Sequence, residues 1–246
     1  MSYFECQSMV RCIRITTPSM RLQGKHVLIT GASGGIGNAL AHALLQEGAA
    51  VTSLDLKPVD GEQAHQQWKA LRVDITKRAQ VEKVLKDIPS IDVLINNAGI
   101  MRRGTVLESS EEDFDALFSV NVKGSWLLLK LAQPHLAEHA MIVQMCSRHA
   151  EHPATDPALY SLTKKCVLDL AVLVAQTYPQ YTVKVLCPGP VDTPLARFGV
   201  SGEQLQQKMK VMHTPEEVAA LIVALLKDDQ KTRLTYDEER GTHQIL

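Results

Sequence analysis

The sequence of 246 residues has no excess of charge of either sign and no long apolar run, and each absence excludes a class of protein. Its 26 basic and 27 acidic residues give a formal net charge of −1, which indicates no nucleic acid or other polyanion as a partner. No window approaches the roughly 20 apolar residues that a membrane span requires, so we expect no membrane partner. With 45% hydrophobic and 22% charged residues, the composition predicts a soluble globular protein.

Cysteine is scarce, and its pattern is not that of a disulfide-bonded or metal-binding protein. The five cysteines are an odd number, include no C-x-x-C pair and lie mostly in apolar segments, where cysteine behaves as a small hydrophobic residue. We therefore expect a reducing, cytoplasmic environment. Residues 1–20 have no apolar core of signal-peptide length, and we interpret them as a disordered N-terminal extension before a single domain over residues 21–246.

From Lys25 onward, short β-branched segments alternate with segments of helical period, the pattern of repeated βαβ units. This alternation predicts a Rossmann-like α/β fold, a doubly wound parallel sheet of six to seven strands with helices on both faces. The expected strands are residues 26–30, 50–55, 70–74, 92–97, 141–146 and 182–187, with a rudimentary seventh at 233–237. The expected helices are residues 36–47, 64–69, 79–86, 111–132 and 159–177.

A glycine-rich turn follows the first expected strand and opens the first expected helix. It has the spacing G-x-x-x-G-x-G, and its candidate binding residues are Gly31, Ser33, Gly34, Gly35, Ile36 and Gly37. Glycine lets the backbone approach a pyrophosphate, and free N–H groups at the following helix N-terminus favour an anion. Because the strict G-x-G-x-x-G spacing is absent, the alternative is a plain glycine-capped turn. The flanking strand and helix favour a dinucleotide phosphate site.

Asp55 ends the second expected strand, 24 residues after Gly31, close to where dinucleotide sites place their ribose-binding acid. A carboxylate there accepts hydrogen bonds from both ribose hydroxyls and repels a 2′-phosphate, which favours NAD over NADP. The alternative is a solvated carboxylate at a strand end. Because Lys57 lies only two residues further on and weakens the discrimination, NADP remains the second candidate cofactor.

Tyr160 and Lys164 lie at i and i+4 in a segment of helical period, so both side chains emerge on one face. An ammonium beside a phenol favours the phenolate and brings its reference pKa of about 10 towards neutrality. Alone, this pair is equally typical of a surface helix. Ser147 supplies the context, because it directly follows the expected strand 141–146 at the sheet edge where open α/β sheets bind ligands. Its hydroxyl can donate a hydrogen bond to a substrate carbonyl oxygen.

In these residues and in several further segments, the chain resembles the short-chain dehydrogenase/reductase family over about residues 21–227. The segments that carry the resemblance are TGASGGIG (30–37), Asp55, Asp74, NNAG (96–99), Asn121, Ser147, YSLTK (160–164) and PGPVDTP (188–194). The resemblance implies an oxidoreductase that transfers a hydride between NAD, or less favourably NADP, and a small secondary alcohol or ketone. It also implies a homodimer or homotetramer.

The resemblance further implies a role for each matching residue. Tyr160 would be the general acid/base on the substrate oxygen, and Ser147 would polarise that oxygen. Lys164 would bind the nicotinamide ribose and lower the pKa of Tyr160, while Asn121 would hold a water that links Lys164 to solvent. The remaining implied cofactor contacts are Asp74 and Ile75 at the adenine, Asn97, Ala98 and Gly99 near the adenosine ribose, and Pro188, Val191 and Thr193 around the nicotinamide.

The chain departs from the family pattern at two places. Cys146 occupies the position before Ser147 where the family commonly has a second serine, and a small buried thiol should be tolerated there. After Pro194 the chain is shorter than usual and lacks the glycine-rich C-terminal end, so residues 194–213 are the expected substrate loop, followed by an atypically short tail. Substrate identity therefore does not follow from the resemblance.

Histidines near the expected active site suggest substrate contact rather than metal binding. His149 and His152 fall between Ser147 and Tyr160, and we expect them near the substrate. Arg102 and Arg103 follow the NNAG segment closely, and we expect them to attract an anionic substrate, although solvated loop positions are the default. Two sets of ligand-type side chains, His149 with Glu151 and His152, and His135 with His139, come without the complete ligand set of a catalytic metal. We therefore predict no metal site.

Two further expectations concern turnover and association. A catalytically idle dinucleotide-binding sensor of the same fold is the alternative function, but a pure binder has no need of a phenol and ammonium beside a polarising hydroxyl. The expected helices 111–132 and 159–177 carry apolar residues on more than one face, which predicts that they pair across a two-fold axis.

Overall fold

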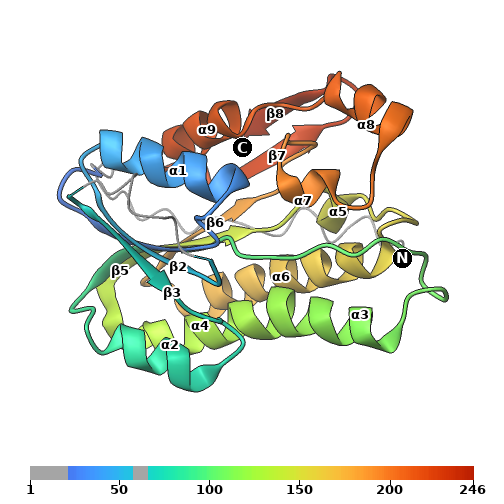
Figure 1. Cartoon of the computed structure of the whole chain (residues 1–246). Helices are drawn as coiled ribbons and strands as arrows, with labels where there is room; N and C mark the ends of the chain where they lie inside the picture. The colour runs from blue at the N-terminus through green and yellow to red at the C-terminus, as the bar shows by residue number, and fades with distance from the viewer. Residues whose placement is uncertain (1–21, 58–65) are drawn as a thin grey trace.

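The computed structural model describes residues 22–57 and 66–246, so the expected N-terminal extension lies outside the described residues. A sheet of eight strands forms the centre of the described part (Figure 1). The strands are β1 (His26–Thr30), β2 (Ala50–Asp55), β3 (Trp68–Arg72), β4 (Ile91–Asn96), β5 (Leu136–Met145), β6 (Thr182–Leu186), β7 (Arg233–Asp237) and β8 (Thr242–Ile245). Their order is β3-β2-β1-β4-β5-β6-β7-β8, with every neighbouring pair parallel except β7 and β8.

Helices cover both faces of the sheet. α1 (Gly35–Gln46) and α9 (Pro215–Lys227) lie on one face, whereas α2 (Arg78–Leu85), α4 (Ser125–Ala132) and α6 (Ala158–Thr177) lie on the other (Figure 1). The remaining helical segments are α3 (Glu111–Leu117), η3 (Phe118–Gly124), η4 (Gln133–His135), α5 (Arg148–Glu151), α7 (Pro194–Arg197) and α8 (Gly202–Met209). The predicted doubly wound α/β architecture is confirmed.

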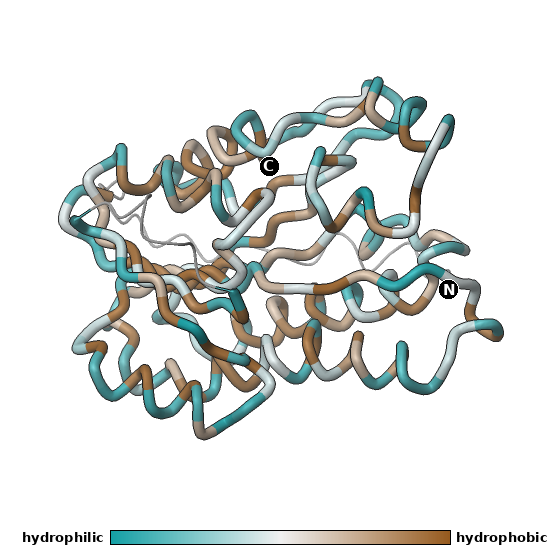
Figure 2. The backbone as a smooth tube through the Cα atoms, viewed as in Figure 1, coloured by the Kyte–Doolittle hydropathy of each residue, from teal (hydrophilic) through white to brown (hydrophobic). Residues whose placement is uncertain are grey.

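Each helical layer has its own hydrophobic core, and the strands contribute to both. In β1, Val27 and Ile29 pack with α1 and α9, whereas Leu28 packs with α2 and α4. This follows from the period of two along a strand, which sends successive side chains to opposite faces. The apolar strand residues therefore lie between the helical layers, as the hydropathy colouring shows (Figure 2). No helix among the described residues is long and apolar enough to cross a membrane.

The strand order places the predicted site segments at one edge of the sheet. β2 and β3 lie on one side of β1, and β4 to β7 lie on the other, so the order reverses between β1 and β4. Such a switch point opens a crevice at the carboxyl ends of the strands. Gly31 follows β1, Asn97 follows β4 and Ser147 lies two residues beyond β5. The fold therefore brings the glycine turn and Ser147 to one crevice.

The expected short helix over residues 64–69 is wrong in the part that the structure describes. β3 begins inside that segment at Trp68, two residues before the expected start of this strand. The Trp68 indole donates a hydrogen bond of 3.0 Å to Ser53 Oγ on β2, and its ring packs edge-on against His42 of α1. Tertiary contacts therefore decide this segment, because so short a helical stretch is marginal without them.

The expected helix over residues 111–132 is helical throughout, but its middle is not α-helical. The segment η3 is a π-helix, a wider turn that occurs frequently at functional sites, and it joins α3 to α4. Asn121 lies within it and is 1% exposed. The helix ends early enough for β5 to begin at Leu136, so His135 and His139 do not share a helix face.

The C-terminal third contains elements that the sequence did not predict. The expected substrate loop over residues 194–213 contains α7 and α8, and α9 follows it. The rudimentary strand 233–237 is confirmed as β7, and its partner β8 adds an eighth strand in place of a featureless tail. The turn between these two strands reaches the crevice described below.

Candidate active site

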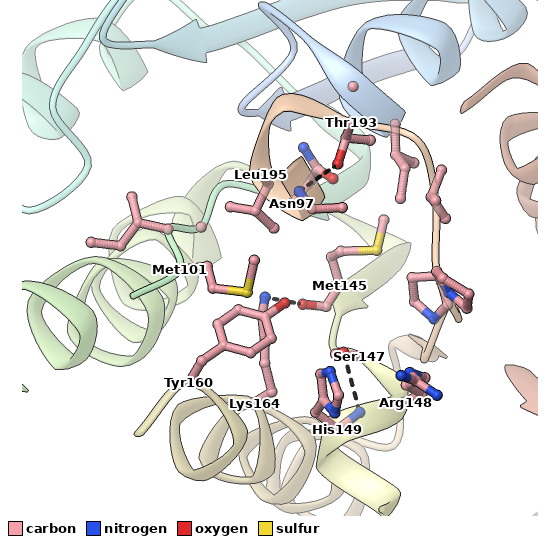
Figure 3. Close-up of a pocket in the computed structure, with 18 of the residues that line it drawn as sticks. Asn97, Met101, Met145, Ser147, Arg148, His149, Tyr160, Lys164, Thr193 and Leu195 are labelled. Atoms are coloured by element: carbon pink, nitrogen blue, oxygen red, sulfur yellow. Dashed lines mark hydrogen bonds between the residues drawn. The ribbon is translucent and has the colours of Figure 1, made fainter. Parts of the chain in front are cut away.

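A cavity of about 1430 Å³ runs along the carboxyl edge of the sheet. It extends from the glycine turn to α7, α8 and the turn between β7 and β8, and Figure 3 shows its part around Tyr160. Every predicted site residue lines this cavity except Ser33, Arg102, Asn121 and His152. The structure therefore brings together residues from seven segments that the sequence places far apart.

The glycine turn is packed tightly on one side and open on the other. A Cβ atom on Gly37 would lie 2.2 Å from the carbonyl oxygen of Gly31, and one on Gly35 would lie 2.9 Å from Thr193 Cγ2. Gly31 and Gly35 also have positive φ angles of 72° and 55°, which residues with a side chain rarely adopt. A Cβ on Gly34, in contrast, would meet nothing within 4 Å. Glycine thus brings the backbone close to the β4 edge and leaves an open cradle.

The cradle fits a dinucleotide. Gly34 caps α1 without a side-chain hydrogen bond, and the first turn of α1 has no acidic residue, so the N–H groups there are available to an anion. Asp55 lies beside the cradle, because its Oδ2 accepts a hydrogen bond of 3.1 Å from the backbone N–H of Ser33. The donors suit a pyrophosphate, and the Asp55 carboxylate suits ribose hydroxyls.

Two side-chain amides, of which that of Asn121 is buried, hold the loops around the cavity in place. Asn97 Nδ2 donates to the carbonyl oxygens of Thr30 and Gly31, at 2.9 and 3.0 Å, and so fixes the glycine turn against the end of β4. Asn121 accepts from the backbone N–H of Ile100 at 2.8 Å and donates to the Ile100 carbonyl and to Thr163 Oγ1, both at 3.0 Å. Asn121 therefore ties the loop after β4 to α6, one residue before Lys164. The implied water relay remains a prediction.

Tyr160 and Lys164 project from α6 towards the end of β5 (Figure 3). Both are buried, at 6% and 4% exposure, and the Lys164 ammonium lies 5.6 Å from the centroid of the Tyr160 ring. Lys164 Nζ donates a hydrogen bond of 2.9 Å to the carbonyl oxygen of Met145, the last residue of β5. Ser147 Oγ accepts from the backbone N–H of His149 at 3.2 Å, which orients it as the cap of α5. The predicted catalytic pair and serine are thus brought together.

Burial is the largest influence on the pKa values of the Tyr160 phenol and the Lys164 ammonium. Loss of solvent raises the pKa of the Tyr160 phenol well above its ordinary value, and the hydrogen bond with Ser147 opposes this rise without cancelling it. Burial also lowers the pKa of Lys164. The expectation that Lys164 brings the phenol pKa below its ordinary value is therefore wrong for this structure, because both partners are desolvated. The phenol is protonated at neutral pH and can donate its proton.

The predicted substrate residues divide into two that line the cavity, His149 and Arg103, and two that lie outside it. His149 lines the cavity, its ring 6.1 Å from that of Tyr160, and burial, reinforced by the charge of Arg148, lowers its pKa. Arg102 instead pairs with Asp113 at 3.0 Å, and His152 is exposed to solvent. Neither Arg102 nor His152 is placed to contact a molecule in the cavity.

The histidine sets do not converge on a metal-binding arrangement. Glu151, which lies between the two histidines of the first set, pairs with Arg233 and accepts a hydrogen bond of 2.7 Å from Thr235 Oγ1. Across residues 22–57 and 66–246, no group of three or more His, Cys, Asp or Glu side chains is placed to hold a metal ion.

The structure also assigns lining residues that sequence reasoning missed. Arg148 lines the cavity beside His149, and Lys208 reaches the cavity from α8. Tyr236 and residues 238–241 reach it from the β7–β8 hairpin. No local pattern marks these residues, because they meet only when the C-terminal third folds against the sheet edge. The acceptor of Lys164 is a backbone carbonyl, which has no side-chain signature.

A doubly wound sheet with a glycine cradle at its switch point and a buried Tyr-x-x-x-Lys pair beside it defines a nucleotide-binding oxidoreductase. Comparison with known families agrees, because the family model described as short chain dehydrogenase matches residues 25–204. The chain belongs to the short-chain dehydrogenase family.

Individual relatives extend over most of the chain. The Danio rerio protein named dehydrogenase/reductase SDR family member 6 is 33% identical over 229 residues, which cover 85% of this chain and 92% of the relative. A Brucella melitensis 3-ketoacyl-(acyl-carrier-protein) reductase complexed with NADH has a TM-score of 0.74 at 27% identity, covering 85% of this chain and 93% of its own. A Burkholderia cenocepacia short chain dehydrogenase in complex with NADP has a TM-score of 0.78 at 25% identity, with coverages of 90% and 91%.

Proposed function

We propose that this oxidoreductase transfers a hydride between NAD(H) and a secondary alcohol or ketone, with Tyr160 as the general acid/base. The observation that carries the proposal is the burial of Tyr160, Lys164 and Ser147 together in the cavity that begins at the glycine cradle. A buried phenol and ammonium are costly to desolvate, and such groups are typical of sites where a proton moves.

Each side chain has a task that follows from its position. Bound NAD(H) accepts or supplies the hydride. The Tyr160 phenol donates a proton to the substrate oxygen in reduction and removes it in oxidation, and the Ser147 hydroxyl donates a hydrogen bond to the same oxygen. Lys164 gives one N–H to Met145 and retains two for the hydroxyls of a ribose. Its positive charge stabilises the phenolate whenever the phenol has lost its proton.

The cofactor proposal is NAD in preference to NADP. Asp55 supports it, because a carboxylate 3.1 Å from the glycine-turn N–H of Ser33 repels the additional phosphate of NADP. The similar solved structures contain NADH in one case and NADP in another, so the fold accommodates either cofactor. The choice in this chain therefore depends on side chains at the end of β2.

We also propose a homodimer or homotetramer, assembled through the outer faces of α4 and α6, in the cytoplasm. Large apolar side chains are exposed on these helices, with Trp126 at 43%, Leu162 at 48% and Leu173 at 59% exposure. Large apolar side chains exposed on the outer faces of two helices support an interface between copies of the chain. Light scattering at micromolar concentration tests the proposal, and a monomer would contradict it.

The proposed reaction is tested by the Tyr160→Phe variant, which keeps the ring but removes the proton. With secondary alcohols and NAD, or ketones and NADH, we expect turnover to fall by about 10²–10⁴ while cofactor affinity is unchanged. The matched control is Tyr178→Phe, a tyrosine at the far end of α6 that is exposed and does not line the cavity. Near-wild-type turnover in Tyr160→Phe would favour the alternative of a dinucleotide-binding sensor.

A further inference from the structure

Charge is distributed unevenly along the cavity. Two carboxylates, Asp55 and Asp74, line its cofactor end, whereas Arg103, Arg148 and Lys208 line the opposite end. These cations come from the loop after β4, from α5 and from α8. Figure 1 shows α5 and α8 on the same side of the molecule, away from β2 and β3. The fold therefore gathers three positive charges from distant parts of the sequence at the end of the cavity opposite Asp55 and Asp74.

The three cations are close enough to affect one another. Burial lowers the pKa of Lys208, and the positive charges of Arg103 and Arg148 lower it further. The same two arginines contribute to the lowered pKa of His149, whose ring lies 6.1 Å from that of Tyr160. The cationic cluster, Arg103, Arg148 and Lys208, therefore lies beside the catalytic tyrosine.

The carboxylates that face this cluster do not neutralise it. Arg103 Nη1 lies 3.7 Å from Asp156, and Arg148 Nη1 lies 2.8 Å from Glu238. Among the described residues, the Lys208 ammonium makes no hydrogen bond or ion pair, although Asp156 is near enough to raise its pKa against the effect of burial. Within the cluster three cations thus face two carboxylates, and the side chains of Arg103 and Arg148 are only 24% and 33% exposed. Lys210 and Arg240 also line the cavity, but Glu239 lines it too and Asp237 lies 3.6 Å from Arg240, so these further charges balance one another.

One positive charge in a partly buried position is in excess, and the repulsion within the cluster is relieved when an anion binds. Arg103 and Arg148 both retain N–H groups beyond those used in their ion pairs, and a guanidinium is a planar fork that matches a carboxylate. A monoanion balances the excess charge, whereas a phosphate monoester brings nearly two negative charges.

We propose that the substrate is a hydroxy or oxo monocarboxylate, whose carboxylate binds the cationic cluster while its hydroxyl or carbonyl oxygen lies at Tyr160 and Ser147. This inference rests on the proposed function and names the substrate class of the same site. Binding of the carboxylate away from the reacting carbon holds that carbon in position, which contributes to rate as well as to affinity.

The test compares acids with their neutral counterparts. Hydroxy acids with the hydroxyl at C2, C3, C4 or C5 are each assayed beside their methyl esters, with 2-butanol as a neutral alcohol and 2-hydroxypropyl phosphate as a dianion. We expect one or more acids to exceed their own esters in kcat/KM by about tenfold or more, the scale of one charge-assisted hydrogen bond. The phosphate should be a poorer substrate than the preferred acid.

Variants identify the residues responsible. Arg103→Gln and Lys208→Gln should each lower kcat/KM for the preferred acid by about ten- to hundredfold, and change that for its ester by less than about threefold. Unchanged ester turnover shows that each variant is folded. The matched control is Arg102→Gln, which alters the adjacent arginine outside the cavity and should leave the acid-to-ester ratio unchanged.

The outcomes separate the inference from the function on which it rests. Equal turnover of acids and esters, turnover of neutral substrates alone, or a preference for the phosphate would overturn the monocarboxylate assignment and leave the proposed function standing. An equal loss for acid and ester in both cluster variants would also overturn it. If no acid, ester, phosphate or neutral alcohol is turned over with NAD or NADP, both the assignment and the proposed function fail.

Discussion

The two ends of the cavity are built in different ways. The cofactor end is made of closely packed backbone. A Cβ atom added to Gly31 or Gly35 would lie 2.9 Å from its nearest neighbouring atom, and one added to Gly37 would lie only 2.2 Å away. The substrate end is made of long charged side chains that are held by ion pairs such as Arg148 with Glu238. One end is fixed by sterics and the other by electrostatics.

The difference corresponds only in part to what the family model covers. The family model matches residues 25–204, which include the cradle, Tyr160, Arg103 and Arg148 but not Lys208, β7 or β8. Most of the cavity therefore lies in the part that the family model matches, and only the contributions of Lys208 and of the β7–β8 hairpin to the substrate end lie outside it. Function specific to this chain must be argued from the second end, since a fold alone does not define a substrate.

The largest of the following effects is expected where the two ends meet, at Ser147. Ser147→Ala removes the hydroxyl that we propose donates to the substrate oxygen, and loss of one such donor costs about 10²–10³ in rate. Ser147→Thr keeps a hydroxyl that can both donate to substrate and cap α5, as Ser147 does now. Steady-state kinetics should therefore show larger residual activity in the threonine variant. Equal losses in both variants would count against a role for the hydroxyl.

A smaller effect is expected when a side chain is added to a glycine on the packed side of the cradle. Gly37→Ala places a Cβ 2.2 Å from the Gly31 carbonyl oxygen, and such overpacking should destabilise the protein by about 1–3 kcal/mol and weaken NAD binding. Gly34→Ala is the matched control, because its Cβ would meet nothing within 4 Å and its φ of −177° suits any residue. Thermal unfolding and NAD titration check both variants. If Gly37→Ala and Gly34→Ala had similar stability and similar NAD affinity, the description of a cradle that is tightly packed on one side and open on the other would be refuted.

The smallest effect concerns cofactor choice. We expect NAD(H) to bind at least about tenfold more tightly than NADP(H), and Asp55→Ala to narrow that gap by removing the charge that repels the 2′-phosphate. Equilibrium titration of both cofactors measures the ratio. Equal affinities in the unmutated protein would remove the basis for the NAD proposal.

The sequence predicted the cofactor end better than the substrate end for a physical reason. Glycine spacing, Asp55 and the Tyr160–Lys164 pair are local patterns whose positions follow once βαβ units are recognised. Arg103 and Lys208 lie 105 residues apart, and nothing local indicates that they meet. Trp68 likewise enters a strand through contacts with β2 and α1 that its own neighbours in sequence do not encode.

The direction of the Tyr160 pKa shift also could not be predicted from the sequence. Spacing predicted that Lys164 lies near the phenol, which is confirmed, but it carries no information on burial. Desolvation depends on every element packed around α6, and here its effect on the Tyr160 pKa outweighs that of the hydrogen bond with Ser147. The sequence therefore predicted that Tyr160 and Lys164 lie together, but it predicted the wrong direction for the pKa shift of Tyr160.

The pH dependence of alcohol oxidation, measured for the wild type and for Tyr160→Phe, tests the central claim most directly. Oxidation needs the phenolate, and because burial raises the pKa of Tyr160, the wild-type rate should still be rising with pH in the alkaline range. The residual rate of Tyr160→Phe should lack this rise, because phenylalanine has no proton to lose. The same rising limb in both proteins would contradict Tyr160 as the group that exchanges a proton with substrate.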